Sequence, residues 1–320
     1  MRLVQHANSL PKEEAVKWLT THRLLFLWKE QSLDNELREY LSQLHLVTIG
    51  ANALAIKRYQ DIVKTLEPIP AVPLKGIALM ETLYAHDPGS RPVRDIDLLV
   101  PAQDIEAAVA ALERDGYKEI DFSRRVGAVD SERTLSIGSV FVDLHSRLEF
   151  VYGRNSTWEM LPLFLSSVHG EEVYTLTDEA TLVYLILHCY KHRLFSSLMW
   201  VHDILVLSEK LPKRPVDEIA TLAKRLRCCN ALALATTLLW SALGQDVLPQ
   251  VDIAELAPSF VRLLLHRVLF LPQEIDLFSP LPIGAKLLEK FHSPLLADDV
   301  LDSGAELLRE VRFFLRVHRL

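Results

Sequence analysis

The sequence is poor in cysteine, and its three cysteines form no recognisable metal or redox motif. Cys189, Cys228 and Cys229 contain no CxxC pair, and an odd number of cysteines cannot pair completely into disulfides. This pattern excludes a cysteine-ligated zinc site and a disulfide framework, and it is typical of proteins in a reducing compartment. The simplest interpretation is that these three are small buried side chains.

The chain also lacks an excess of basic residues. Its 35 Lys and Arg stand against 42 Asp and Glu, so the formal net charge over 320 residues is −7. Such a protein has no counterion-release drive toward bulk nucleic acid, although local basic pockets are compatible with this charge. With 49% hydrophobic and 24% charged residues, the composition excludes a disordered chain and is sufficient for a globular core.

Long hydrophobic runs are missing as well. The most apolar window, residues 231–243, is shorter than the roughly 20 residues that span a bilayer, and it contains Thr and Ser. Residues 1–18 lack the continuous apolar stretch and the small-residue cleavage site of a secretory signal. We therefore expect a cytoplasmic protein without a membrane partner.

Hydrophobic periodicity divides the chain into an N-terminal helical segment (1–66), an α+β core (67–150) and a larger C-terminal helical domain (151–320). The β-rich pieces of the core are 71–74, 95–100, 117–120, 134–137 and 140–145, with helical patterns at 77–84 and 104–115. The helices expected after Pro162 include 178–192, 198–210 and 216–243. We predict an α+β fold in which a small mixed sheet is flanked by helices from both sides in sequence.

The run RPVRDIDLLV, residues 91–100, carries two acids in a strongly β-forming context. Side chains alternate along a strand, so Asp95 and Asp97 point to one face while Ile96 and Leu98 point to the other. Two carboxylates about 6 to 7 Å apart repel each other unless a cation lies between them, and hard oxygen ligands suit Mg²⁺. The alternative is a solvated edge strand with two aspartates that have no function.

Two other segments add chemistry to this strand. VFVDLH, residues 140–145, places Asp143 and His145 on one face of an apolar strand, where His145 either touches the site or closes the core. The strand at 71–74 ends in Lys75-Gly76 and passes directly into a helix. There, backbone N–H groups, a small residue and a cation converge as a phosphate would require.

Arg91 and two histidines are further candidate ligands. Arg91 either stabilises charge on a phosphate or pairs with a nearby acid such as Asp87. His188 and His192 lie four apart on a predicted helix, in HCYKH, which lacks the glutamate of the metallopeptidase motif HExxH. The two histidines are therefore packed between domains, contact a phosphate or the acceptor, or form a separate metal site.

These motifs resemble those of a known family. VPLKGIALMETLY, the arginine at 91, DIDLLV, VDLH and the helical stretch HCYKHRLFSSLMWVHDILVL are similar to an uncharacterised bacterial family of the nucleotidyltransferase superfamily, which shares its sheet with DNA polymerase β and aminoglycoside nucleotidyltransferases. The resemblance covers roughly residues 15–210. It implies that Asp95 and Asp97 hold catalytic Mg²⁺ or Mn²⁺ ions, and that Asp143 shares a metal or accepts the acceptor's proton.

The resemblance also implies a reaction, the Mg²⁺-dependent transfer of a nucleoside monophosphate, by default AMP from ATP, to a hydroxyl of a small molecule or protein. Lys75-Gly76 stands where the superfamily usually has Gly-Ser, so a lysine point charge substitutes for a serine hydroxyl. The expected nucleotide ligands are Lys75, Gly76, Arg91, His188 and His192. The alternatives are a catalytically silent nucleotide-binding or regulatory module of a toxin-antitoxin or biosynthetic system, and a metal-dependent phosphohydrolase.

Overall fold

The computed structural model describes residues 2–120, 132–151, 154–156, 158–191, 197–211 and 216–243. The strands are β1 (Val72–Pro73), β2 (Asp95–Leu99), β3 (Lys118–Glu119), β4 (Glu132–Ile137), β5 (Val140–His145), β6 (Leu148–Val151), β7 (Arg154–Ser156), β8 (Leu163–Val168) and β9 (Glu171–Leu176). They form a five-stranded sheet of order β1-β2-β5-β4-β3 and two hairpins, β6-β7 and β8-β9. In the large sheet β2 and β5 are parallel and the other pairs antiparallel, which confirms the predicted α+β fold with a mixed sheet.

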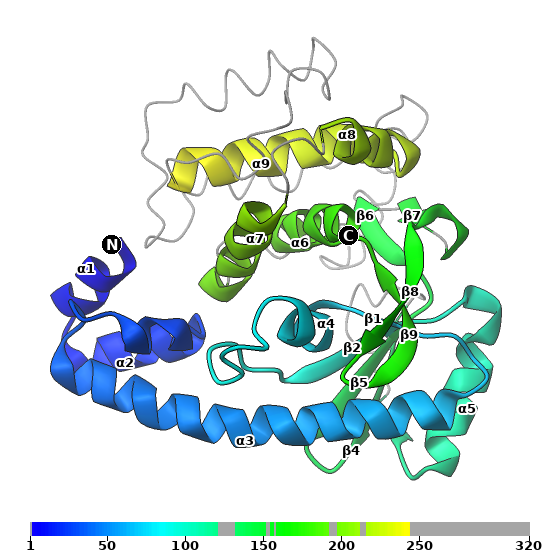
Figure 1. Ribbon diagram of the computed structural model, residues 1–320, viewed down its shortest axis with the longest axis horizontal. Helices are drawn as coiled ribbons and strands as arrows, with labels where there is room; N and C mark the ends of the chain where they lie inside the picture. Colours follow the sequence, from blue (N-terminus) through cyan, green and yellow to red (C-terminus); the bar gives the residue numbers. More distant parts are fainter. Residues whose placement is uncertain are drawn as a thin grey trace, which may run out of the picture.

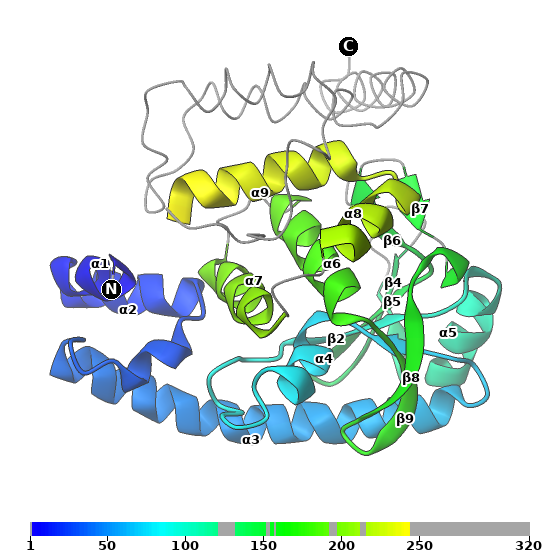
Figure 2. The ribbon, with the colours of Figure 1, turned by 45° about the horizontal axis from the view of Figure 1, so that its top comes forward.

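Helices surround this sheet. They are α1 (Arg2–Ser9), α2 (Lys12–Thr21), η1 (Leu25–Lys29), α3 (Asn35–Leu66), α4 (Lys75–Thr82), η2 (Ala102–Asp104), α5 (Ile105–Arg114), η3 (Trp158–Met160), α6 (Asp178–Lys191), α7 (Leu198–Lys210), α8 (Val216–Arg225) and α9 (Cys229–Leu243), η being 3-10 helices. The long helix α3 runs along one side of the molecule, α6 and α7 lie on the other side of α4, and α8 and α9 lie beyond them (Figure 1, Figure 2). The sheet thus lies between α3 and α6.

The two faces of the sheet differ in chemistry because side chains alternate along each strand. Buried residues on one face pack against the C-terminal half of α3 and against α5. The strand residues of this core include Ile96, Leu98, Leu135, Val142 and Leu144. The opposite face is left to the polar residues of β2 and β5, as the alternation of DIDLL predicts.

Helix α3 begins at a side-chain cap. The carboxylate of Asp34 accepts hydrogen bonds from the backbone N–H groups of Glu36 (3.0 Å) and Leu37 (3.3 Å), which satisfies two donors of the first turn.

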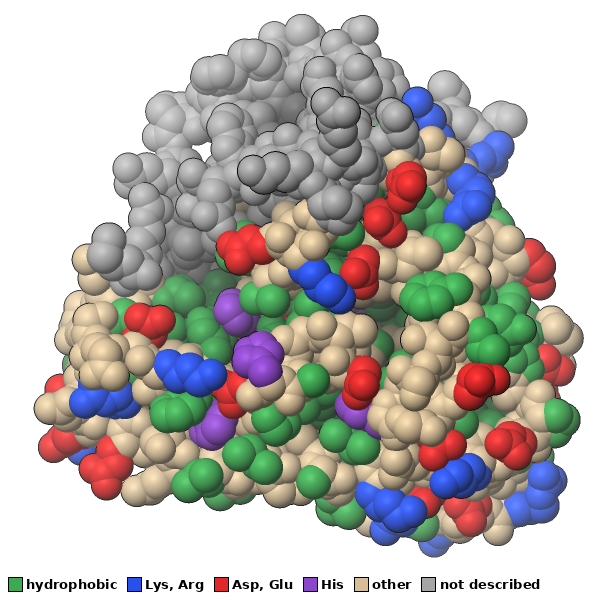
Figure 3. Space-filling view, viewed as in Figure 1, with side chains coloured by type: hydrophobic (Ala, Val, Ile, Leu, Met, Phe, Trp, Pro, Cys, Tyr) green, Lys and Arg blue, Asp and Glu red, His purple; other side chains and the backbone are tan. Residues whose placement is uncertain are grey.

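In its middle, α3 exposes Leu46, Val47 and Leu54 to solvent. The space-filling view shows few charged side chains along this part of the helix (Figure 3). The middle of α3 therefore carries apolar residues on its outward face as well as its inward one.

Two parts of the chain differ from the helices expected after Pro162. Residues 163–176 form the hairpin β8-β9, whose turn residues His169 and Gly170 have φ of 52° and 85°, the positive values that a tight hairpin turn requires. The single helix expected over 216–243 is two helices, α8 and α9, separated near Arg227 with φ of 53°. Both interruptions are left-handed residues, which hydrophobic periodicity does not reveal.

The structure also tests the interpretation of the cysteines and the search for membrane-spanning segments. All three cysteines are buried and none forms a disulfide, which confirms their interpretation as small core side chains. Within the part of the chain that the structure describes, none of the helices combines the length and the hydrophobicity needed to cross a bilayer.

Candidate active site

Three carboxylates meet on the polar face of the sheet. In the parallel pair β2-β5, Asp97 is the register partner of Asp143, and Asp95 is the partner of Phe141. Register partners in a sheet point to the same side, and residues two apart on a strand do so as well. Asp95, Asp97 and Asp143, which we call the acid face, therefore share one side of the sheet, opposite the hydrophobic core.

Asp97 is the buried centre of the acid face, with a relative exposure of 3%. The Lys75 ammonium donates to its Oδ1 at 2.7 Å, and Nε2 of His145 lies 3.0 Å from the same oxygen. Burial alone would raise the pKa of Asp97, but Lys75 and the contact with His145 hold it well below its usual range. Asp97 is therefore ionised at every physiological pH.

Lys75 is fixed in place by the turn between β1 and α4. It is the first residue of α4 and has a φ of 44°, a left-handed conformation that costs a non-glycine residue about 1 kcal/mol. Burial would lower the pKa of its ammonium, but the charge of Asp97 raises it. Tyr184 of α6 lies beside it, and burial raises the pKa of this phenol although Lys75 acts in the opposite direction. The ammonium is thus a permanent positive charge beside Asp97 on the acid face.

The other two acids have raised pKa values. Burial raises the pKa of Asp143 to about 6; the hydrogen bond from Oγ1 of Thr134 to its Oδ1, at 2.6 Å, acts against this shift, and the charge of Asp97 adds to it. Burial and the neighbouring Asp97 also raise the pKa of Asp95. A carboxyl that titrates near neutral pH can accept and release a proton during a reaction.

The acid face carries carboxylate oxygens, which are common metal ligands, but Asp97 is paired with Lys75. Among the described residues, no group of three or more His, Cys, Asp or Glu side chains is placed to hold a metal ion. The ammonium of Lys75 instead provides the positive charge beside Asp97. Carboxylate oxygens are the ligands that Mg²⁺ prefers, and the raised pKa values of Asp95 and Asp143 indicate a surplus of negative charge there. The donor set fits a hard divalent cation.

Gly76 and Arg91 lie next to each other behind this turn. A Cβ on Gly76 would lie 3.1 Å from Nη1 of Arg91, so the absence of a side chain makes room for the guanidinium. Arg91 is buried and bonds Asp203 of α7 through Nε (3.0 and 3.1 Å) and Nη2 (2.8 Å). Tyr84 donates to the same carboxylate at 2.7 Å. Arg91 therefore pairs with an acid, as one of the two alternatives predicts, but the partner is Asp203, 112 residues away in sequence, and Asp87 was the wrong acid.

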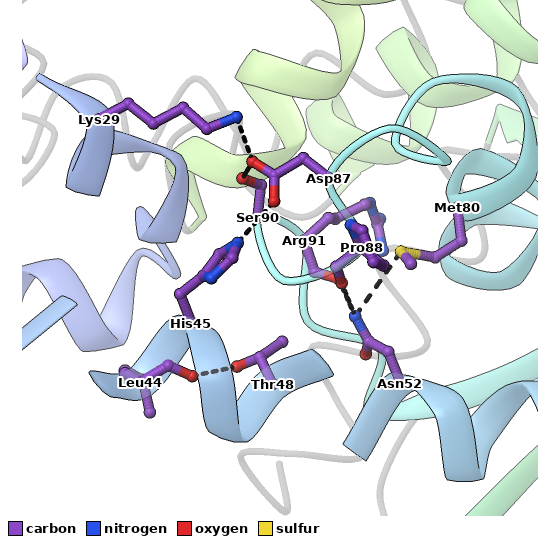
Figure 4. A network of polar contacts seen from close by, with 10 residues as sticks. All are labelled: Lys29, Leu44, His45, Thr48, Asn52, Met80, Asp87, Pro88, Ser90 and Arg91. Atoms are coloured by element: carbon purple, nitrogen blue, oxygen red, sulfur yellow. Dashed lines mark hydrogen bonds and ion pairs between the residues drawn. The ribbon is translucent and has the colours of Figure 1, made fainter. Parts of the chain in front are cut away.

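A second polar cluster holds the loop that leads into β2 (Figure 4). The amide of Asn52 donates to the carbonyls of Pro88 (2.5 Å) and Arg91 (2.8 Å) and accepts from the N–H of Val93 (2.9 Å). A Cβ on Gly89 would lie 2.5 Å from the ring of His45, so this loop passes directly against α3. Asn52 thus fixes the backbone on both sides of Arg91.

Asp87 completes this cluster. Its carboxylate contacts Lys29 (2.5 Å), His45 (2.5 Å) and the hydroxyl of Ser90. We call Lys29, His45, Asn52, Asp87 and Ser90 the loop network. Of these residues, only Asp87 was a candidate from the sequence, and for another role; the signal for the others was a polar residue, Asn52, among the buried residues of a helix.

Of the two candidate histidines, the structure describes only His188. His188 of α6 packs its ring against Trp200 of α7 at 4.9 Å between centroids and against Tyr184 at 5.8 Å. It therefore lies one helical turn beyond the Tyr184 side chain that neighbours Lys75. His192 lies outside the described residues.

Comparisons with known proteins identify the family of this chain. A family described as "uncharacterised nucleotidyltransferase" matches residues 8–244, which include the whole acid face. Among solved structures, the crystal structure of ANT(2'')-Ia in complex with adenylyl-2''-tobramycin is 14% identical, with 54% of this chain and 97% of that chain covered and a TM-score of 0.41. The solution structure of the antibiotic-resistance factor ANT(2'')-Ia is 15% identical, with 60% and 96% covered and a TM-score of 0.41. No curated protein matches the chain.

Proposed function

Because the chain belongs to this family of nucleotidyltransferases, we propose that it transfers a nucleoside monophosphate, by default AMP from ATP, to a hydroxyl of a small molecule or a protein. The family makes the chain an enzyme that transfers nucleotidyl groups. The observation that carries the finer proposal is the register of β2 and β5, which sets Asp97 beside Asp143 with Asp95 on the same side. Three acids on one side of a small sheet are costly to a fold that does not use them.

In this proposal Asp95 and Asp97 hold Mg²⁺ or Mn²⁺, and Asp143 either shares a metal or accepts the acceptor's proton. Their oxygen donors support it, and so does charge, since three carboxylates and a triphosphate repel each other strongly without a divalent cation. When bound, the metal supplies neutralisation and polarisation for in-line attack of the acceptor oxygen on the α-phosphorus, with pyrophosphate leaving.

In the second of these two roles, Asp143 accepts the proton of the attacking hydroxyl. Its pKa of about 6 leaves most of the carboxylate ionised at neutral pH, yet close enough to that pH to bind a proton during the reaction. Thr134 holds Oδ1 through its hydroxyl and so sets the orientation of the carboxylate. Thr134 therefore acts as a positioning residue in this proposal.

Lys75 and Gly76 are proposed to form the phosphate end of the site. The ammonium of Lys75 is a fixed positive charge, and the backbone N–H groups at the start of α4 add partial positive charge in the same place. His145 contacts the Asp97 carboxylate and orients it toward this end. Lysine serves as a point charge here, without the bidentate geometry of arginine.

Arg91 is proposed to act through Gly76. Its guanidinium is held by Asp203 and lies against Gly76, so it supports the Lys75-Gly76 turn from behind. The contacts of His188 and His192 with phosphate or acceptor stay predictions, and the packing of His188 between α6 and α7 is compatible with the wall of such a site.

The proposal is tested by incubating the purified chain with α-³²P-labelled nucleoside triphosphates, Mg²⁺ or Mn²⁺, and candidate hydroxyl acceptors. We expect label on an acceptor or on the protein itself and release of pyrophosphate. Asp95→Asn should lose this transfer, whereas Asp61→Asn, which removes a surface acid paired with Lys57 on α3, should retain it.

The other outcomes separate the alternatives. Label released as free nucleoside monophosphate would indicate water as the acceptor, hence a hydrolase. Nucleotide binding without turnover would indicate a silent regulatory module. Equal transfer by Asp95→Asn and the unaltered chain would overturn the role given to the acid face.

A further inference from the structure

Lys75 and Arg91 each pair with a buried acid, but the two ion pairs are built differently. Arg91 binds Asp203 through Nε (3.0 and 3.1 Å) and Nη2 (2.8 Å), and the two side chains are 5% and 0% exposed. The ammonium of Lys75 donates to one oxygen of Asp97, Oδ1, at 2.7 Å, and the lysine side chain is 17% exposed. Several parallel hydrogen bonds fix a guanidinium in direction, whereas an ammonium on a four-carbon stem can change its partner. The ammonium of Lys75 is therefore the more mobile of the two cations.

The backbone of Lys75, by contrast, is fixed beside Asp97. The N–H of Leu74 donates to the carbonyl of Asp97 at 2.9 Å, which joins the residue before Lys75 to β2. Lys75 follows with a φ of 44° and begins α4, whose second residue is Gly76. The lysine stem thus starts from a fixed point between the Asp97 carboxylate and the first turn of α4, where the phosphate end of the site is proposed. Both partners are near the same ammonium.

One oxygen of Asp97 is shared by two nitrogen atoms. Nζ of Lys75 lies 2.7 Å from Oδ1, and Nε2 of His145 lies 3.0 Å from it. Asp97 itself is 3% exposed, so this carboxylate lies inside the protein, where charges interact more strongly than in water. A divalent cation on Asp97 would have to share the carboxylate with the ammonium, and like charges that share one buried acid repel each other. Lys75 therefore opposes metal binding for as long as it stays on Asp97.

We propose that Lys75 is a built-in counter-cation of the acid face, which keeps metal binding weak until a polyphosphate attracts the ammonium away from Asp97. This inference rests on the proposed function, and it adds the order in which the site fills. A polyphosphate carries several negative charges and binds an ammonium as a point charge. The metal ion would accordingly enter together with the nucleotide, and the chain without nucleotide would bind it poorly.

The test is the binding of Mn²⁺ alone to the full chain, followed by the electron paramagnetic resonance signal of the free ion. Lys75→Met should bind Mn²⁺ at least about tenfold more tightly than the unaltered chain, because the competing charge is gone. Lys75→Arg keeps that charge and should stay close to the unaltered chain. Lys64→Met removes a lysine that pairs with Glu171 at 3.2 Å, away from the acid face, and as the matched control it should change nothing. Adding Asp95→Asn to Lys75→Met should remove the gain, which would locate the bound ion.

A second readout uses the unaltered chain, so it holds even if thermal unfolding shows that Lys75→Met does not fold. The ¹⁵N resonance of the Lys75 ammonium, assigned by its loss in Lys75→Arg, should stay in place with Mg²⁺ alone. It should shift when Mg²⁺ and inorganic tripolyphosphate are both present. The inference is overturned if folded Lys75→Met binds Mn²⁺ no more tightly than the unaltered chain. It is also overturned if Mg²⁺ alone shifts the resonance as far, or if neither addition shifts it.

These outcomes separate the inference from the proposed function. Transfer of label by the unaltered chain, with equal Mn²⁺ affinities of the unaltered chain and Lys75→Met, would remove only the inference. Tighter Mn²⁺ binding by Lys75→Met, with no transfer from any nucleotide, would remove only the proposed function.

Discussion

Two clusters of polar groups lie near residues 87–97, and the pKa of Asp87 in one is shifted in the opposite direction to that of Asp143 in the other. In the loop network, burial would raise the pKa of Asp87, but Lys29, Ser90 and His45 lower it to about 2. In the acid face, burial and the neighbouring acids raise the pKa of Asp143 to about 6. The residue type is the same, and the difference lies in how many partners each carboxylate has.

This difference separates a carboxylate that stabilises the fold, Asp87, from one that destabilises it, Asp143. A carboxylate with a full set of donors is more stable ionised in the folded chain than in the unfolded one, whereas a crowded carboxylate is less stable. The loop network therefore contributes to folding and fixes the entry into β2. The surplus charge of the acid face is explained by a ligand that compensates it, such as the metal and nucleotide proposed above.

The largest expected loss of transfer is that of Asp97→Asn, and Asp87→Asn is its comparison. Asp97→Asn leaves the buried Lys75 without its counterion and removes a proposed metal ligand. We expect nucleotidyl transfer to fall at least about a hundredfold and the free energy of unfolding to fall by about 3 kcal/mol. Asp87→Asn should reduce stability by breaking its contacts but leave most of the transfer rate in the folded fraction. Urea denaturation and label transfer measure both, and equal inactivity of the two folded variants would contradict the comparison.

The next effect concerns the loop network itself. Asn52→Ala leaves two carbonyls and one N–H of the loop without partners, which should lower the free energy of unfolding by about 2 to 4 kcal/mol. Thr48→Ala, one turn earlier on α3, is the control, since its hydroxyl bonds only the carbonyl of Leu44 on the same helix. We expect a loss of about 1 kcal/mol or less for the control. Similar losses in the two variants would show that Asn52 does not clamp the loop.

The pH dependence of stability should have opposite signs in the two clusters. Because the folded pKa of Asp143 is raised from 3.8 to about 6, its contribution to stability is present below 3.8 and is lost as the pH rises to about 6. Because the folded pKa of Asp87 is lowered from 3.8 to about 2, the contribution of Asp87 to stability is present above pH 3.8 and is lost as the pH falls to about 2. Denaturation of Asp143→Asn and Asp87→Asn against the unaltered chain over this range measures each difference, and differences of the same sign would refute it.

The smallest effect is a shift in the pH profile of transfer. Thr134→Val removes the hydrogen bond that lowers the pKa of Asp143, so the acidic limb of kcat/KM should move upward by about one pH unit. The rate well above neutral pH should change little. Ser136→Ala, two residues along β4 on the same side of the sheet, is the control and should leave the limb in place. An unshifted limb in Thr134→Val would remove Asp143 as the titrating group.

Much of the sheet follows from local pattern. The alternation of Asp95-Ile96-Asp97-Leu98 predicts which side chains share a face, and the strand and both helices around it lie where the pattern predicts them. Gly116, directly after the C-cap residue Asp115 of α5, has a φ of 92°, the left-handed conformation that glycine favours at the end of a helix. By contrast, the turns at Arg23 and His169 use left-handed residues other than glycine, and their neighbours in space decide those conformations.

The sequence by itself determined the α+β class, the strand that carries two acids on one face, and the position of the lysine-glycine turn. These depend on periodicity and on neighbours within a few residues along the chain. Only the tertiary structure decided which charges are neutralised. Arg91 pairs with Asp203, 112 residues away, and Lys75 pairs with Asp97. Coulomb energy depends on distance in space and on burial, and neither can be read from spacing along the chain.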